Sequence, residues 1–166
     1  PGPIGGEVLS SGDAGGLETF TMGNSQMAYV SDQASAQKVM ADFKKEGVDA
    51  IKLYSRMPPA LLKIAAQEAH RQGFRVFAHY PNTVGMDEIL DTGIDVNVHL
   101  NGLLVATAPK EIRDRFKKGE IVPAAHLLDT SKFPALAKEM VARKIMINPS
   151  LSRDGSGMNM PFSAAG

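Results

Sequence analysis

Hydrophobic positions along this chain switch repeatedly between two spacings. Short segments in which apolar residues recur at every second position or closer, as in strands, occur at residues 50–54, 74–79, 93–99 and 145–149. Apolar residues three or four positions apart, as on one face of a helix, occur at residues 32–46, 57–73, 84–91, 109–118 and 131–143. The chain thus alternates strands with helices, a pattern that predicts parallel β/α units joined by right-handed crossovers.

Local signals set the limits of these elements. Asp32 is a plausible helix N-cap and Gly47 a natural C-terminal stop, while Pro59 suits the first turn of a helix that Gly73 ends. The segments outside this rhythm are one short predicted strand and three regions expected to be loops. They are the strand at 4–10 and the loops at 15–27, 121–129 and 153–166.

Three of the predicted strands end on side chains that can do chemistry: Lys52, His79 and His99. In parallel β/α folds, functional residues gather at the carboxyl ends of the strands. Strand alternation predicts that the three side chains face one mouth. It also places Asp95 and Asn97 on the same face as His99, with the intervening valines covered by helices.

The chemistry that these residues share is metal binding. Imidazole is a good Zn²⁺ ligand, and two histidines on neighbouring strands would converge at the rim of the sheet. Lysine becomes a ligand only if CO₂ adds to its neutral amine, which gives a carbamate that can bridge two metal ions. Water bound to such a metal has its pKa lowered towards ~7 and can act as a nucleophile.

The sequence here resembles the amidohydrolase superfamily, in particular its imidazolonepropionase-like and Xaa-Pro dipeptidase-like branch. Residues 47–52 (GVDAIK) resemble the fourth barrel strand, in which the lysine is carboxylated in many members. Residues 68–79 are similar to the helix and fifth strand, 93–99 to the sixth strand, and 147–151 to the seventh. The opening residues 2–4 are similar to the third strand.

The resemblance implies a parallel (β/α) barrel of the TIM type that is incomplete in this chain. Residues 1–166 would form part of a (β/α)8 metal-dependent hydrolase barrel covering about strands three to seven, with loop-rich ends at 1–31 and 152–166. The rest of the barrel, or a homo-oligomer, would cover the open sheet edges.

The same resemblance implies a metal-dependent hydrolase of C–N bonds in an amide, a dipeptide or a cyclic amide. Carboxylated Lys52 would bridge two Zn²⁺ ions, His79 and His99 would bind one of them, and metal-activated water would be the nucleophile. The family's first-strand His-x-His pair and eighth-strand aspartate are absent, since Asp154 comes too early. The isolated chain is therefore expected to be inactive.

Other polar residues near the strand ends are weaker candidates. Tyr54 and Tyr80 could donate hydrogen bonds to substrate, with Tyr54 better placed because it shares the parity of Lys52. His70, on a predicted helix, is expected to be structural, and His126 to be a solvated loop residue.

Two alternative functions remain open from the sequence. Lys52 also ends an Asp-x-Ile-Lys strand of the kind found in barrel aldolases, where a lysine amine forms a Schiff base with a carbonyl substrate. The histidines at the next two strand ends favour the metal. The other alternative is a barrel fragment with no catalytic activity, kept as a scaffold or interaction module.

The composition mainly shows which partners, membrane spans and cysteine-based features are not expected. Eighteen basic and eighteen acidic residues give no net charge, so nothing favours nucleic acid or an anionic membrane as a partner. No apolar run approaches a transmembrane span, which predicts a soluble protein. The absence of cysteine excludes disulfides and thiolate ligands. The N-terminus lacks both an initiator Met and signal-peptide features, which suggests a processed or truncated product and leaves the compartment undecided.

Overall fold

The structure, a computed structural model, describes residues 5–10, 26–54, 56–81, 83–100, 102–118, 120 and 129–149. Its strands are β1 (Gly5–Ser10), β2 (Gln26–Val30), β3 (Ala50–Tyr54), β4 (Arg75–His79), β5 (Val96–Val98) and β6 (Met146–Asn148). Its α-helices are α1 (Gln33–Lys45), α2 (Pro59–Arg71), α3 (Leu103–Thr107), α4 (Lys110–Lys117) and α5 (Phe133–Ala142). Two short 3₁₀ helices are η2 (Met86–Ile89) and η4 (Thr130–Lys132).

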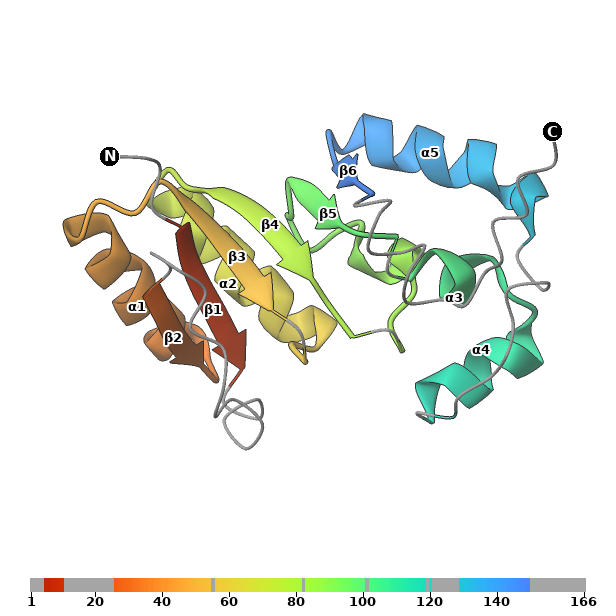
Figure 1. The fold of residues 1–166 in the computed structure, drawn as a ribbon, viewed down its shortest axis with the longest axis horizontal. Helices are drawn as coiled ribbons and strands as arrows, with labels where there is room; N and C mark the ends of the chain where they lie inside the picture. The colour runs from red at the N-terminus through yellow and green to blue at the C-terminus, as the bar shows by residue number, and fades with distance from the viewer. Residues whose placement is uncertain are drawn as a thin grey trace, which may run out of the picture.

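The six strands form one sheet in the order β2-β1-β3-β4-β5-β6, and every neighbouring pair is parallel (Figure 1). The predicted α/β class with a parallel sheet is therefore confirmed. The described strands form an open sheet with β2 and β6 at its edges, so a closed barrel is not seen in this part of the chain. No helix among the described residues is long and apolar enough to cross a membrane.

The main core lies between the sheet and the helices that follow β2 and β3. In β3 and β4 the alternate residues Ile51, Leu53, Val76 and Ala78 have no exposed surface. They pack in one cluster with the buried face of α2, which lies behind the sheet in Figure 1. Burying a branched aliphatic side chain of this kind contributes about 1.5–3 kcal/mol. This packing fixes which face of the sheet is left for other functions.

A buried carboxylate joins the two covering helices. Glu68 of α2 is only 4% exposed, and its carboxylate accepts a hydrogen bond from the Gln33 side chain of α1 at 3.1 Å. Arg71, one turn further along α2, forms an ion pair with the same carboxylate. Because a buried charge is costly unless it is paired, these two contacts explain why Glu68 is tolerated under the helix layer.

Most predicted elements are found close to their predicted limits. The strand 50–54 is reproduced as β3, the helix 32–46 as α1, and the helix after Pro58 as α2. Gly47 and Gly73 follow their helices with φ values of 76° and 82°, which explains why glycine ends both. The predictions at 153–166 and at most of 121–129 fall outside the described residues.

Three predictions of secondary structure need correction. Residues 26–27, assigned to a loop, begin β2, and α3 was not predicted. The strand predicted over 93–99 is reduced to the three residues of β5, because Asp95 uses its side chain to bind the Val76 amide at 2.7 Å and the chain turns at His99. The predicted helix at 84–91 is a single 3₁₀ turn, η2.

The N-terminus of α1 gives a pH-dependent test of the fold. The Asp32 carboxylate accepts a hydrogen bond from the Ser35 amide at 2.8 Å, and the Ser35 hydroxyl accepts one from the Asp32 amide at 3.0 Å. The hydrogen bonds from the Ser35 backbone and hydroxyl lower the pKa of Asp32. We expect Asp32→Ala to lower the melting temperature at neutral pH, because the exposed first turn loses its cap.

The pH dependence follows from the direction of that pKa shift. A carboxyl group with a lowered pKa in the folded state stabilises the protein above its unfolded pKa, near 3.9, and this contribution is lost as the pH falls through the folded pKa. The difference between wild type and Asp32→Ala should therefore shrink below pH 4 in thermal melts. Asp32→Asn, which keeps a cap without a titrating group, should lack this pH dependence. A difference between wild type and Asp32→Ala that does not change with pH would contradict this account.

Candidate functional site

One face of the sheet carries polar residues of β3 and β4. Lys52 was predicted to end its strand but lies in the middle of β3, which Tyr54 ends, and His79 ends β4. Lys52 is in register with Phe77, and Tyr54 is in register with His79. Residues paired across a parallel ladder point to the same side, and this side is opposite to the one buried under α2. Lys52, Tyr54 and His79 are each partly exposed. The sheet therefore presents these three side chains together, as strand alternation predicted.

The rings at the strand ends form a continuous row of contacts. The Lys52 Nζ atom lies 4.9 Å from the centroid of the Tyr54 ring, in a cation–π arrangement. The Tyr54 ring meets the His79 ring edge to face, with centroids 4.9 Å apart. The His79 ring in turn meets the His99 ring at 5.0 Å and an interplanar angle of 81°. Lys52, Tyr54, His79 and His99 are hereafter called the strand-end cluster.

A backbone turn places His99 in the strand-end cluster, and the prediction that regular strand alternation does so is wrong. The register pairs Val96 with Phe77 and Asn97 with Ala78, so Val96 lies on the face of His79 and Asn97 on the helix-covered face. Regular alternation would then send His99 to the helix side, with Asn97. His99 instead has a φ of 64°, and this left-handed turn brings its ring towards His79.

The face predicted for Asp95 and Asn97 must be corrected for the same reason. The Asp95 carboxylate lies on the helix side, where it is 3.0 Å from Nε2 of His70 on α2. Asn97 is completely buried. His70 is thus found on a helix in contact with a strand-flanking carboxylate, in keeping with the structural role expected for it, whereas His126 lies outside the described residues.

Tyr80 is not brought to the strand-end cluster. Its side chain has no exposed surface, and burial strongly raises the pKa of its hydroxyl, to which the nearby Asp87 carboxylate adds. A hydrogen bond with the Asn97 side chain acts in the opposite direction. The Tyr80 ring lies next to Gly102 in the core. This placement gives the predicted contact between Tyr80 and substrate no geometric support.

The donor types of the strand-end cluster fit a zinc ion only in part. Two imidazoles from neighbouring strands lie close enough to share one ion, and zinc prefers such nitrogen ligands. In the described part of the chain, however, no three side chains of the His, Cys, Asp and Glu types are grouped so that they could hold a metal. Further ligands must come from a lysine carbamate or from elsewhere.

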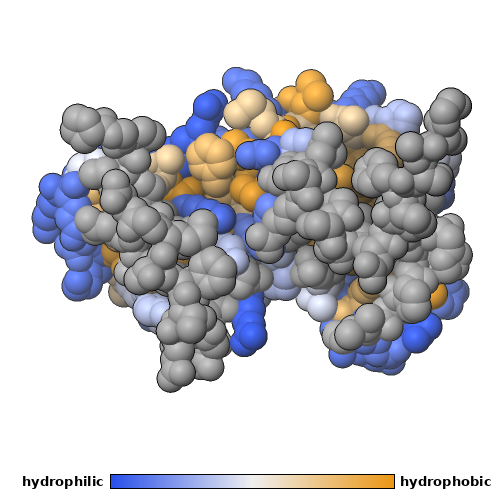
Figure 2. Space-filling view, in the orientation of Figure 1, coloured by the Kyte–Doolittle hydropathy of each residue, from blue (hydrophilic) through white to orange (hydrophobic). Residues whose placement is uncertain are grey.

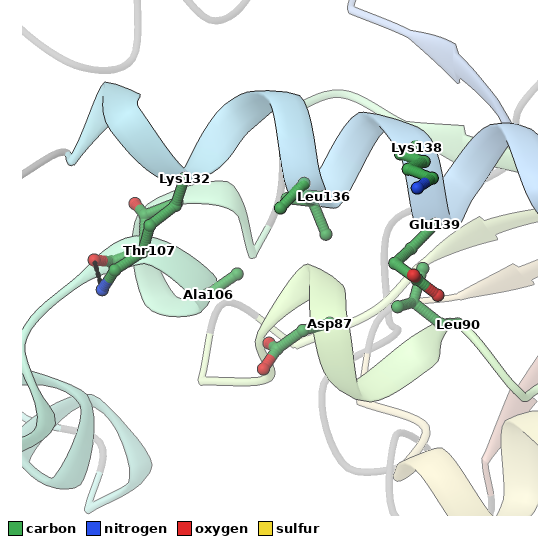
Figure 3. Close-up of a pocket in the computed structure, with 9 residues that line it drawn as sticks. Asp87, Leu90, Ala106, Thr107, Lys132, Leu136, Lys138 and Glu139 are labelled. Atoms are coloured by element: carbon green, nitrogen blue, oxygen red, sulfur yellow. Dashed lines mark hydrogen bonds between the residues drawn. The ribbon is translucent and has the colours of Figure 1, made fainter.

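A separate pocket of about 430 Å³ lies between α5, α3 and η2 (Figure 3). Its walls are mostly apolar, with Leu90, Ala106 and Leu136 among them, and charged residues such as Lys138 and Glu139 also line it. None of the strand-end cluster lines this pocket. It is therefore not an extension of the candidate site.

The outer strand next to the site leaves apolar surface uncovered. All three residues of β6 are exposed, and Met146 and Ile147 are 47% and 43% exposed. Hydrophobic surface is visible over β4 and near the β6 end of α5 (Figure 2). Among the described residues β6 pairs only with β5. An edge strand of this kind is suited to pairing with a further strand.

Comparison with known proteins gives one partial likeness. No protein-family model matches the chain, and no curated protein matches it significantly. Among solved structures, a chain described as bottromycin amidohydrolase is similar at 26% identity with a TM-score of 0.43. The match covers 64% of this chain and 22% of that one. At this TM-score the likeness does not by itself establish fold or function.

Proposed function

We propose that this chain is the middle part of a (β/α)8 barrel of the amidohydrolase type, which hydrolyses C–N bonds with the help of divalent metal. The observation that carries the proposal is the strand-end cluster. A lysine from the middle of β3, the histidine that ends β4 and the histidine that follows β5 lie, with Tyr54, on one continuous row of contacts, and these three strands are consecutive in the sheet order. Packing alone would not require these residue types at these three positions.

Within this proposal, His79 and His99 would hold one zinc ion through their ring nitrogens. Bound zinc would supply a water of lowered pKa and polarise the substrate carbonyl. His99 is 8% exposed, so one side of the site is shielded from solvent. His79 is partly exposed, which leaves an approach for a small amide, dipeptide or cyclic amide.

Lys52 would act as a ligand after carboxylation. The Lys52 ammonium would first lose one proton. The neutral amine would then attack the carbon of CO₂, an N–C bond would form as one C=O π bond opens, and a second proton would be released, which leaves a carbamate with two oxygen donors. The charge on Lys52 would change from positive to negative over these two steps, so its contact with the electron-rich face of the Tyr54 ring would be lost. The Tyr54 hydroxyl would then be available to orient a substrate carbonyl from the same face.

The sheet edges are consistent with a larger barrel. In this proposal the exposed β6 and the opposite edge strand β2 would each pair with a neighbouring barrel strand, from the remainder of the barrel or from a second copy. Such partners would also supply the ligands that the described residues lack. The proposal includes two earlier predictions: that residues 1–166 form part of the barrel domain, and that the site holds two zinc ions.

The test is metal and activity analysis of the protein that contains the complete barrel. We expect it to purify with zinc and to hydrolyse members of a panel of dipeptides and cyclic amides, with activity abolished by chelation and restored by zinc. Lys52→Ala should abolish hydrolysis, whereas Lys63→Ala, on the exposed face of α2, should leave it unchanged. Hydrolysis that survives chelation, or a protein that binds no divalent metal, would rule the proposal out.

Experiments on the same complete-barrel protein also test the two alternative functions, a Schiff-base lysine enzyme and a fragment without catalytic activity. A Schiff-base lysine would be trapped covalently on Lys52 by borohydride in the presence of a carbonyl substrate. Formation of a Schiff base on Lys52 does not require the contact between His79 and His99. A fragment without catalytic activity would give neither borohydride trapping nor hydrolysis in any assembly.

A further inference from the structure

Two hydrogen bonds, one to the amide and one to the carbonyl group of His99, hold this residue in an unusual backbone conformation. Its φ of 64° is rare for any residue with a side chain, although histidine tolerates it better than most. The His99 amide donates to the carbonyl oxygen of Asn148 on β6 at 2.7 Å. The His99 carbonyl accepts a hydrogen bond from Nδ2 of Asn97 at 3.2 Å. The turn is thus fixed by one contact to the next strand and one to a side chain.

Asn97 is an unexpected residue for its position. It has no exposed surface and lies on the helix-covered face of the sheet, in register with Ala78. Burying an amide costs free energy unless the group is hydrogen-bonded, and the residues in register with Asn97 on the neighbouring strands, Ala78 and Ile147, are aliphatic. An aliphatic residue would serve the core better. The amide is explained by what its nitrogen binds, the His99 carbonyl, because the buried Asn97 Oδ1 has no hydrogen-bond partner among the described residues.

The turn held by Asn97 decides where the His99 ring lies. If the chain continued as a regular strand, His99 would share the face of Asn97 and lie away from His79. With the left-handed turn, the ring centroids of His79 and His99 are 5.0 Å apart. The hydrogen bond from Asn97 closes this turn from the buried side, at a spacing of two residues.

We propose that Asn97 is a positioning residue, whose side-chain amide keeps His99 in the left-handed turn that presents its ring to His79. The purpose of this positioning, to hold a metal, rests on the proposed function. The positioning itself does not depend on a metal and can be measured without one.

The test compares Asn97→Leu with wild type by NMR of the metal-free 166-residue chain. In wild type, a nuclear Overhauser contact should connect the His79 and His99 rings. Leucine has the same branching and the same number of side-chain heavy atoms and cannot donate a hydrogen bond, so the contact should disappear in Asn97→Leu. Thr92→Val is a matched control, because it also removes a buried hydrogen bond from a side chain to a carbonyl, 2.6 Å long and made to Ile89. It should keep the contact between the rings.

A contact between the rings that is equally strong in Asn97→Leu would overturn the proposal. If this variant does not fold, wild type alone decides: the Asn97 side-chain amide protons should exchange slowly with solvent and lie close to His99, and fast exchange would contradict the inference. Titration of the protein that contains the complete barrel with zinc chloride then tests the link to function. Asn97→Leu should bind zinc about tenfold or more weakly, as expected for loss of a group that orients a metal ligand. If wild type binds no zinc, the proposed function fails while the NMR result stands.

Discussion

His79→Ala should weaken zinc binding by more than about 100-fold, the largest functional effect that we expect from a single substitution. Loss of groups that merely orient a metal ligand costs 10- to 100-fold in affinity, so loss of the ligand itself should cost more. His79 ends β4 with regular strand geometry, so alanine changes the side chain without straining the backbone. His99→Ala would be harder to interpret, because alanine at φ 64° adds strain of its own.

His70→Ala is the matched control for this experiment. His70 is a partly exposed histidine that contacts the Asp95 carboxylate from α2, on the opposite side of the sheet from the strand-end cluster. It should lower thermal stability slightly and leave zinc affinity within about twofold of wild type, because surface pairs contribute little. Calorimetric titration of the protein with the complete barrel gives the zinc affinity, and a thermal melt of the same protein gives the stability. Equal zinc affinity in His79→Ala and wild type would remove His79 from the site.

Gly102→Ala should destabilise the protein by about 3 kcal/mol or more, the largest effect that we expect from a glycine-to-alanine substitution in the described part of the chain. Gly102 has a φ of 74°, and a Cβ atom there would lie 2.5 Å from the Val84 carbonyl oxygen and 2.7 Å from the Met86 amide nitrogen. Both obstacles are backbone atoms, so relief requires movement of the segment that carries η2. The left-handed backbone alone costs a non-glycine residue about 1–2 kcal/mol, and the clash adds to it.

Gly47→Ala allows the cost of the left-handed backbone to be measured without the steric clash. Gly47 has a similar φ of 76°, but a Cβ atom there would meet nothing within 4 Å. Its substitution should therefore cost only the backbone term, about 1–2 kcal/mol. Urea denaturation of both variants measures the difference in the free energy of unfolding. If the two substitutions had equal effects, the close approach at Gly102 would have no energetic weight.

The sequence allowed the helix-covered half of the fold to be predicted well. The 3.6-residue spacing in α1 and α2, together with their terminal glycines, is local information that tertiary structure has not altered. The alternation in β3 and β4 likewise placed Lys52 and His79 on one face. These predictions held because each residue follows the regular geometry of its element.

The placement of His99 could not be predicted, because it depends on a break in that geometry. Nothing in the residues around Asn97 signals a left-handed turn, and the assumption of a continuous strand led to the wrong face for Asp95 and Asn97. The roles of residues in binding metal and substrate could not be predicted from the sequence pattern for a second reason. A set of ligands is defined by distances between segments, and some of the necessary segments lie outside the described residues.

The parallel pairing throughout the sheet has a consequence for how the chain acquires its structure. No strand pair can be closed by a tight turn, because each pair of parallel strands needs a crossover. Lys52 pairs with Phe77 across one intervening helix, but it also pairs with Glu7, from which residues 11–25, β2 and α1 separate it in the sequence. Loop-closure entropy rises with the length of chain enclosed, so we expect β3 to pair with β4 before it pairs with β1.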